Sequence, residues 1–353
     1  VSKNNALDTI TVGGTTAAAG KVSVTSTGAD VAAGVNLGNI AVTGGTEITV
    51  NQYAGNAAAT GNDTDGGNIT VTGNEKTTTV TVNQTAFGTG TTANAATGVV
   101  GVVGYQAGTV TIADKNAASA TDAGTITTVT LKNYDDSTIN SGALTTVNLE
   151  GTAGTLGITA GALTTAKVDT LGLNLKGVVA NAGGNAITVD SVYKTLNVKS
   201  STTASTITAT NTDATAINIS GDAALTLTVL NLGAAAGNEV ITVTNTAGVT
   251  IGNALATDVT FTGGAGKDSV ILTANYTKAI NMGAGDDTVV YAAAGAGGSL
   301  NGGAGNDTLV VSANSAIAGL PEVSGFEVLK VKGASAVGGT THNAHTFKAL
   351  EVG

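Results

Sequence analysis

The sequence predicts an all-β protein: a parallel β-helix or β-roll solenoid preceded by an N-terminal domain of repeated β-strands. Three observations support this. Small and β-branched residues dominate the composition, apolar and polar residues alternate along short segments, and similar segments recur along the chain. The 353 residues include 51 Gly and one Pro, and only 3% are aromatic. Branched side chains fit a pleated strand, and glycine supplies the positive φ that tight corners need.

Residues 1–113 are expected to form the repeated strand domain. The segment from Gly38 to Gly44 recurs at 67–73, and the segment from Thr46 to Gln52 recurs at 78–84. Each copy alternates apolar and polar residues with a period of two, which indicates strands with one buried face.

Residues 114–235 are expected to form a β-solenoid with coils of about 19–21 residues. Similarity that returns at such a fixed period is typical of solenoid proteins. The segment from Leu144 to Leu149 is matched at 163–168, and related strands occupy 195–198 and 216–219. Such regular return fits stacked coils, in which each coil buries its apolar side chains against the next. A disordered Thr- and Ala-rich linker is the alternative, but disordered segments are depleted in β-branched residues, and here their alternation persists.

Residues 236–325 contain three copies of the nonapeptide Gly-Gly-x-Gly-x-Asp-x-U-x, where U is a large apolar residue. The copies begin at Gly263, Met282 and Gly302, and Met282 replaces the first glycine of its copy. Ca²⁺ takes about six to eight oxygen ligands, which glycine-rich loops supply as backbone carbonyls and aspartate supplies as a charged carboxylate. The candidate calcium-binding residues are Asp268, Asp287, Asp307, Gly264, Gly266, Gly283, Gly285, Gly303, Gly305, Asp286 and Asn306.

The three motif aspartates are almost evenly spaced along the chain, at intervals close to the length of two nonapeptides. In a roll with two loops per coil, all three are therefore expected on one edge. We expect two ions between successive loops, one between Asp268 and Asp287 and one between Asp287 and Asp307. Metal-free β-turns are the alternative, because Gly-Asp-Asp and Gly-Asn-Asp are also common turn sequences.

Other acidic residues are weaker candidates. Glu239 and Asp258 are separated by the same interval as Asp268 and Asp287, and they fall on the expected opposite edge, where the next acids of a series are missing. The acid-rich segments 61–66 and 134–136 are more typical of solvated turns than of calcium loops.

Composition argues against several classes of function. All 14 basic residues are Lys and the net charge is −10, so nucleic-acid binding is not expected. The chain lacks Cys, and we expect no enzyme because its only histidines, His342 and His345, are expected in a surface loop. No apolar stretch approaches the roughly 18 residues of a membrane helix, so no membrane-spanning segment is expected. The start at Val1 has no signal-peptide profile, which indicates an excised or processed chain.

The nonapeptides resemble those of RTX proteins, a family of calcium-binding proteins that Gram-negative bacteria secrete through type I channels. The segment 326–333 resembles the strand that commonly follows the calcium repeats in that family, and it is echoed at 347–353. Residues 326–353 are thus expected to continue the strand repeats. The Ala-, Thr-, Gly- and Val-rich composition without Arg is similar to that of RTX-type surface-layer (S-layer) proteins.

The resemblance implies a structural S-layer protein of the bacterial cell surface. It implies type I export with an uncleaved C-terminal signal, folding on meeting extracellular Ca²⁺, and assembly with copies of itself into a two-dimensional lattice. Before calcium binds, repulsion among the acids and the entropy of the glycine-rich loops should keep the roll unfolded. A cell-surface polysaccharide would be a further partner, bound through a region outside this sequence.

Two alternatives stay open. One is an RTX adhesin, in which the solenoid is a stalk that presents a ligand-binding tip. The other is a calcium-binding appendage of a secreted protease or polysaccharide enzyme. The enzyme is less favoured because the sequence has neither a His-rich zinc motif nor aromatic residues along a groove.

Overall fold

The computed structural model describes residues 2–3, 9–28, 37–54, 66–86, 106–163, 168–181, 183–232, 238–273, 276–291, 298–311, 322–332 and 347–352. Every helix or strand in these ranges is a β-strand. The chain divides into two compact units, Val1–Tyr193 and Lys194–Gly353, and the strands within each unit pair in parallel. The prediction of an all-β parallel solenoid is confirmed.

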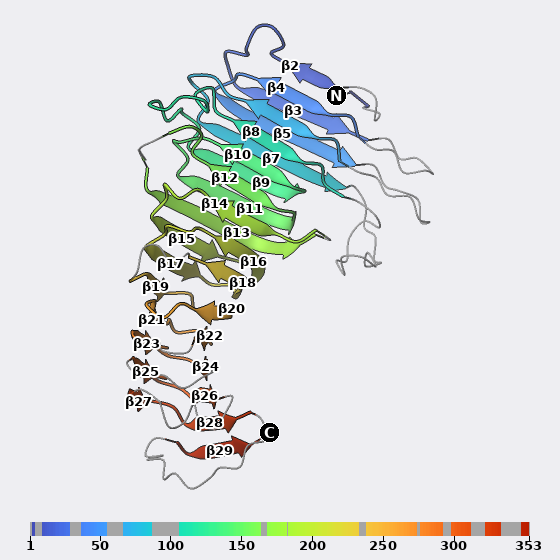
Figure 1. Ribbon diagram of the computed structural model, residues 1–353. Helices are drawn as coiled ribbons and strands as arrows, with labels where there is room; N and C mark the ends of the chain where they lie inside the picture. Colours follow the sequence, from blue (N-terminus) through green and yellow to red (C-terminus); the bar gives the residue numbers. More distant parts are fainter. Residues whose placement is uncertain are drawn as a thin grey trace. The chain divides into compact units, whose positions relative to one another are not determined.

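In the first unit, successive strands alternate between two parallel sheets, so that each coil adds one strand to each sheet (Figure 1). Sheet A contains the odd-numbered strands, β1 (Ser2–Lys3), β3 (Val22–Thr27), β5 (Glu47–Ala54), β7 (Thr79–Ala86), β9 (Thr128–Tyr134), β11 (Thr146–Ala153) and β13 (Thr170–Ala180). Sheet B contains the even-numbered strands, β2 (Ile10–Val12), β4 (Ile40–Thr43), β6 (Ile69–Thr72), β8 (Val110–Ala113), β10 (Ser137–Asn140), β12 (Leu156–Thr159) and β14 (Ala186–Val189).

The second unit follows the same alternation, except that the last described strand joins the sheet of the strand before it. Its odd-numbered strands up to β27, again called sheet A, are β15 (Thr195–Ser200), β17 (Ala216–Gly221), β19 (Val240–Val243), β21 (Thr260–Thr262), β23 (Ala279–Asn281), β25 (Ser299–Asn301) and β27 (Glu322–Ser324). Its sheet B contains β16 (Ser205–Thr210), β18 (Leu225–Asn231), β20 (Val249–Leu255), β22 (Ser269–Leu272), β24 (Thr288–Tyr291), β26 (Thr308–Val311), β28 (Val328–Val331) and β29 (Ala349–Val352).

The sequence repeats of the first unit become neighbouring strands. Ile40 pairs with Ile69 in sheet B, and Ile48 pairs with Val80 in sheet A, which is the register that the two repeated segments predict. The two strands of each repeat do not pair with one another, because they lie in different sheets. Each repeat is thus one coil of a solenoid.

One predicted repeat is wrong in register. The match between 144–149 and 163–168 predicts that these two segments pair, but Val147 pairs with Leu173, which lies beyond the second segment. The physical reason is the apolar alternation of β13, in which the side chains of Leu171, Leu173 and Leu175 are at most 1% exposed. The predicted pairing of 195–198 with 216–219 is confirmed, since Leu196 pairs with Ile217.

The core of each unit lies between sheets A and B. It consists of files of apolar side chains, where a file is a column of side chains at equivalent positions in successive coils. Inward-facing Val129 and Leu131 of β9 are fully buried, and Val147 and Leu149 of β11 lie beside them in register. Strand β8 pairs with both β6 and β10, so the pairing of sheet B runs on across residue 113. The finer division of the chain at residues 113, 235 and 325 stays a prediction.

Truncating one member of such a file should destabilise the first unit. Leu131→Ala is expected to lower the free energy of unfolding by about 2–5 kcal/mol, because it leaves a cavity between two stacked coils. Thr138→Ala, on the exposed face of β10, is the matched control and should change it by less than about 0.5 kcal/mol. Urea denaturation measures both, and equal effects would contradict this packing.

Candidate metal centre

The three motif aspartates lie in one file on one edge of the second unit. Asp268, Asp287 and Asp307 each end the turn that leads from a strand of sheet A to a strand of sheet B. The residues that follow them, Ser269, Thr288 and Thr308, pair in register across β22, β24 and β26. The aspartates therefore occupy equivalent positions in successive coils, and their side chains are at most 1% exposed.

Hydrogen bonds link the carboxylates of this file to the backbone of the preceding coil. The N–H of Val249 donates to Oδ1 of Asp268 at 2.8 Å. The N–H of Asp268 donates to Oδ1 of Asp287 at 2.7 Å, and the N–H of Asp287 donates to Oδ1 of Asp307 at 2.8 Å. Each carboxylate is thus held in the interval between its own coil and the coil before it.

The second carboxylate oxygens divide into two kinds. Oδ2 of Asp268 accepts the N–H of Gly264 at 2.9 Å, within its own turn. Oδ2 of Asp287 and Oδ2 of Asp307 are buried and have no hydrogen-bond partner. A buried carboxylate oxygen without a partner is costly unless a proton or a cation compensates it. The two unpartnered oxygens lie in the two intervals where the sequence predicts calcium.

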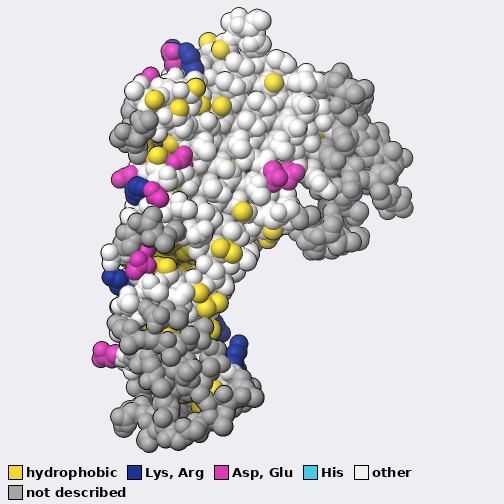
Figure 2. Space-filling model, viewed as in Figure 1, with side chains coloured by type: hydrophobic (Ala, Val, Ile, Leu, Met, Phe, Trp, Pro, Cys, Tyr) yellow, Lys and Arg dark blue, Asp and Glu magenta, His cyan; other side chains and the backbone are white. Residues whose placement is uncertain are grey.

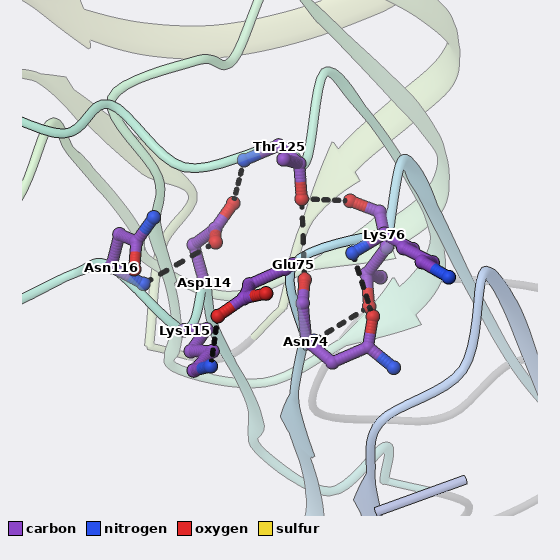
Figure 3. Close-up of polar contacts among 8 residues, drawn as sticks. Asn74, Glu75, Lys76, Asp114, Lys115, Asn116 and Thr125 are labelled. Carbon is purple, nitrogen blue, oxygen red and sulfur yellow. Dashed lines mark hydrogen bonds and ion pairs between the residues drawn. The ribbon is translucent and has the colours of Figure 1, made fainter. Parts of the chain in front are cut away.

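A buried carboxylate of the first unit provides a contrast. The side chain of Asp114 is 3% exposed, and its Oδ2 accepts the N–H groups of Thr125 at 2.6 Å and Ile126 at 2.7 Å and the Ser141 hydroxyl at 3.2 Å. Oδ1 of Asp114 accepts the N–H of Asn116 at 3.4 Å (Figure 3). This chain therefore satisfies a buried carboxylate with protein donors where its role is to hold a turn.

The glycines of the last two loops let successive coils approach closely. Gly285 and Gly305 have φ of +129° and +148°, a region that favours glycine. A Cβ on Gly285 would lie 2.6 Å from the carbonyl oxygen of Gly266, and one on Gly305 would lie 1.9 Å from that of Gly285. Any side chain here would separate the coils, so the loops keep backbone carbonyls close to the file.

The remaining motif residues support the same stacking. The N–H of Ala284 donates to the Gly264 carbonyl at 2.8 Å, and that of Ala304 donates to the Gly283 carbonyl at 2.9 Å. Gly303 has a positive φ of +99°. Asp286 and Asn306 are exposed, and the N–H of Asn306 donates to Oδ1 of Asp286 at 2.9 Å. Their side chains thus lie outside the buried file.

The electrostatics of the file favour a bound proton or cation. Burial is the main cause that raises the pKa of Asp287 to about 7; the charges of Asp268, Asp307 and Asp286 act in the same direction, and the hydrogen bond from Asp268 opposes them. Burial also raises the pKa of Asp268 and that of Asp307 above the ordinary range. The charged form of the file is therefore disfavoured when no counter-cation is present.

Ligands for a metal here must come largely from the backbone. Among the described residues, no group of three or more His, Cys, Asp or Glu side chains converges to hold a metal. Each interval has instead one carboxylate and two glycine-rich turns. Charged carboxylate and neutral carbonyl oxygens are ligands that Ca²⁺ prefers, whereas Zn²⁺ prefers nitrogen and sulfur.

The weaker candidates on the opposite edge are not equivalent to one another. Glu239 precedes Val240, which pairs with Thr260, so Glu239 stands level with Val259 rather than with Asp258. The side chain of Glu239 is 1% exposed, and neither carboxylate oxygen has a partner, whereas Asp258 is half-buried. A role in calcium binding stays a prediction for both residues.

Other expected turns are placed as follows. Oδ1 of Asp135 accepts the Asn181 amide at 2.7 Å, and Oδ1 of Asp136 accepts the Thr155 hydroxyl at 2.8 Å, so both acids have protein partners. His342, His345 and most of the segment 61–66 lie outside the described residues.

Sequence reasoning missed one carboxylate of the file. The N–H of Asp307 donates to Oε2 of Glu327 at 2.9 Å, so Glu327 continues the ladder into the next coil. Glu327 precedes Val328, which pairs with Thr308. Glu327 follows Asp307 at the same interval by which Asp307 follows Asp287, and this spacing would have identified it. The turn before Glu327, however, lacks the glycine motif on which the search relied.

Comparison with protein-family models found no match for this chain, and comparison with curated proteins found no significant relative. Among the residues that the structure describes, there is no helix with the length and apolar character needed to cross a membrane.

The raised pKa of Asp287 predicts how pH acts on the calcium-free roll. In EDTA, the folded fraction of the second unit should fall as the pH rises from 3.8, the ordinary value of an aspartate, to about 7. The reason is that the folded state binds the proton more tightly than the unfolded state does, and this stabilisation is lost as the carboxyl ionises. Far-ultraviolet circular dichroism measures the folded fraction.

The control for this prediction is Asp287→Asn, which keeps the shape of the side chain but cannot ionise. It should weaken the pH dependence in EDTA, and the remaining dependence comes from Asp268 and Asp307, whose pKa values burial also raises. With saturating Ca²⁺, the wild type should instead gain stability over the same pH range, because the metal requires ionised carboxylates. An identical pH dependence for wild type and variant in EDTA would contradict this assignment.

Proposed function

We propose that this chain is a structural surface-layer protein that folds on binding Ca²⁺ and assembles with copies of itself into a two-dimensional lattice on a bacterial cell surface. The proposal includes export by a type I route and a structural rather than a catalytic role. The observation that carries it is the buried file of carboxylates, with unpartnered oxygens on Asp287 and Asp307, between stacked glycine-rich turns.

The file would act as the folding switch. Bound calcium would neutralise the charge of the buried carboxylates, and the backbone carbonyl oxygens of the adjoining turns would complete its coordination. Without calcium, folding must bury three carboxylates in successive coils with no cation beside them. Asp268, Asp287 and Asp307 are each at most 1% exposed in the folded chain. Since no preformed site exists in the unfolded chain, the free energy of binding becomes free energy of folding.

Assembly is supported by the surface of the solenoid. Figure 2 shows few charged side chains on the viewed face, and only 11% of all residues are charged. On sheet B of the first unit, Thr70, Thr111 and Thr138 are exposed and stand in register on neighbouring strands. Charged residues are depleted at the centres of protein interfaces, so uncharged faces of this kind suit contacts between copies.

The stacked arrangement predicts unequal effects of removing the aspartates. Asp287→Ala should remove the ion between Asp268 and Asp287, because the Asp287 carboxylate, with its unpartnered oxygen, enters that interval. Asp307→Ala should remove the ion between Asp287 and Asp307 for the same reason, whereas Asp268→Ala should remove neither, because both oxygens of Asp268 have protein donors. Asp286→Ala, a neighbouring charge outside the buried file, is the control and should change calcium binding least. Isothermal titration calorimetry with Ca²⁺ gives the number of ions bound, and equal losses for Asp268→Ala and Asp287→Ala would contradict the assignment of one carboxylate to each interval.

The lattice itself is tested by electron microscopy of the purified full-length protein. At millimolar Ca²⁺ we expect ordered sheets, and after addition of EDTA we expect the sheets to disperse. If calcium folds the protein but only single particles remain, the lattice proposal fails and an adhesin stalk becomes the better explanation. If calcium changes neither folding nor assembly, the whole proposal fails.

A further inference from the structure

The carboxylate file ends on a lysine. Val328 of β28 pairs with Ala349 of β29, so the residues before them, Glu327 and Lys348, stand level in successive coils. Lys348 therefore occupies the position that Asp268, Asp287, Asp307 and Glu327 hold in the four coils before it. A cationic side chain replaces an acidic one where the sheet register continues unchanged.

The interval between the turns that end at Asp307 and Glu327 has one wall in common with the two intervals before it. One wall is the turn from Gly302 to Asp307, which has the same nonapeptide pattern as the turn of the preceding coil. Glu327 enters the interval in the same way as the aspartates, because its Oε2 accepts the N–H of Asp307 at 2.9 Å. The interval thus has a carboxylate in the place where the others have one.

The second oxygen of Glu327 has a different partner from those of Asp287 and Asp307. Oε1 of Glu327 lies 3.7 Å from Nζ of Lys348, and the Glu327 side chain is 17% exposed. The corresponding oxygens of Asp287 and Asp307 are buried and have no partner. Within the described part of the chain, only the last of these three intervals has an ammonium group paired with its carboxylate.

We propose that Lys348 is a built-in counter-cation that closes the last interval to metal and so limits the file to two ions. This inference rests on the proposed calcium binding. An ammonium group beside Glu327 neutralises the carboxylate and repels a divalent ion that would approach the same oxygens. The carbonyls and the carboxylate of the interval would otherwise offer the hard oxygen ligands that suit Ca²⁺.

The opposite end of the file is closed in a different way. Asp268 has protein donors on both oxygens, the N–H groups of Val249 and Gly264. In the coil before it, the turn contains Asn245, whose Oδ1 accepts the N–H groups of Ala247 at 2.8 Å and Gly248 at 2.9 Å. A neutral amide and backbone donors end the file on one side, and the Lys348 ammonium ends it on the other.

The test counts calcium ions per chain in the full-length protein by calorimetry, with a terbium luminescence titration as a second readout. Lys348→Met removes the charge and keeps much of the length of the side chain, and it should raise the count by one ion. Adding Glu327→Gln to this variant should return the count to the wild-type value. Because the Lys348 side chain is 79% exposed, neither the Met variant nor Lys348→Gln should prevent folding.

Lys330→Met is the matched control, since Lys330 belongs to the preceding coil and pairs with Glu351 outside the file at 3.0 Å. It removes the same charge and should leave the count unchanged. If Lys348→Met and Lys348→Gln bind the same number of ions as the wild type, the inference is overturned while the calcium proposal stands. If the wild type and all variants bind no calcium, both are overturned.

Discussion

The structure depends on one constraint, the in-register parallel stacking of coils. Each residue lies beside the residue at the same position in the next coil, as Val289 does beside Leu309. Apolar side chains gain from this repetition, because a buried file continues through the core without a gap. Stacking of like residues therefore decides which side chains are favourable at each position.

Polar residues respond to the same constraint according to their chemistry. An amide both donates and accepts, so asparagines stack well: Nδ2 of Asn174 donates to Oδ1 of Asn148 at 2.8 Å, and Asn218 repeats this with Asn197 at 2.9 Å. A carboxylate only accepts, so a file of aspartates leaves oxygens without donors and places like charges in neighbouring coils. Such a file needs protons or cations.

This need gives the second unit its proposed role. A segment whose folding is unfavourable without a cation and favourable with one stays unfolded until the cation is present. The ends of the file limit this dependence, because backbone donors satisfy Asp268 and Lys348 lies beside Glu327. Calcium dependence would then be confined to the intervals around Asp287 and Asp307.

The sequence by itself determined the all-β solenoid, because period-two alternation and repeated segments are local signals that stacking preserves. It also predicted that Asp268, Asp287 and Asp307 lie on one edge, since near-equal spacing in a roll implies equivalent positions. Only the tertiary structure decided the pairing of Val147 with Leu173, because register depends on which apolar side chains fill the core. It also brought Lys348 into the file after Glu327, since Lys348 has no motif and carries the opposite charge, so that only the strand pairing beside it shows its place.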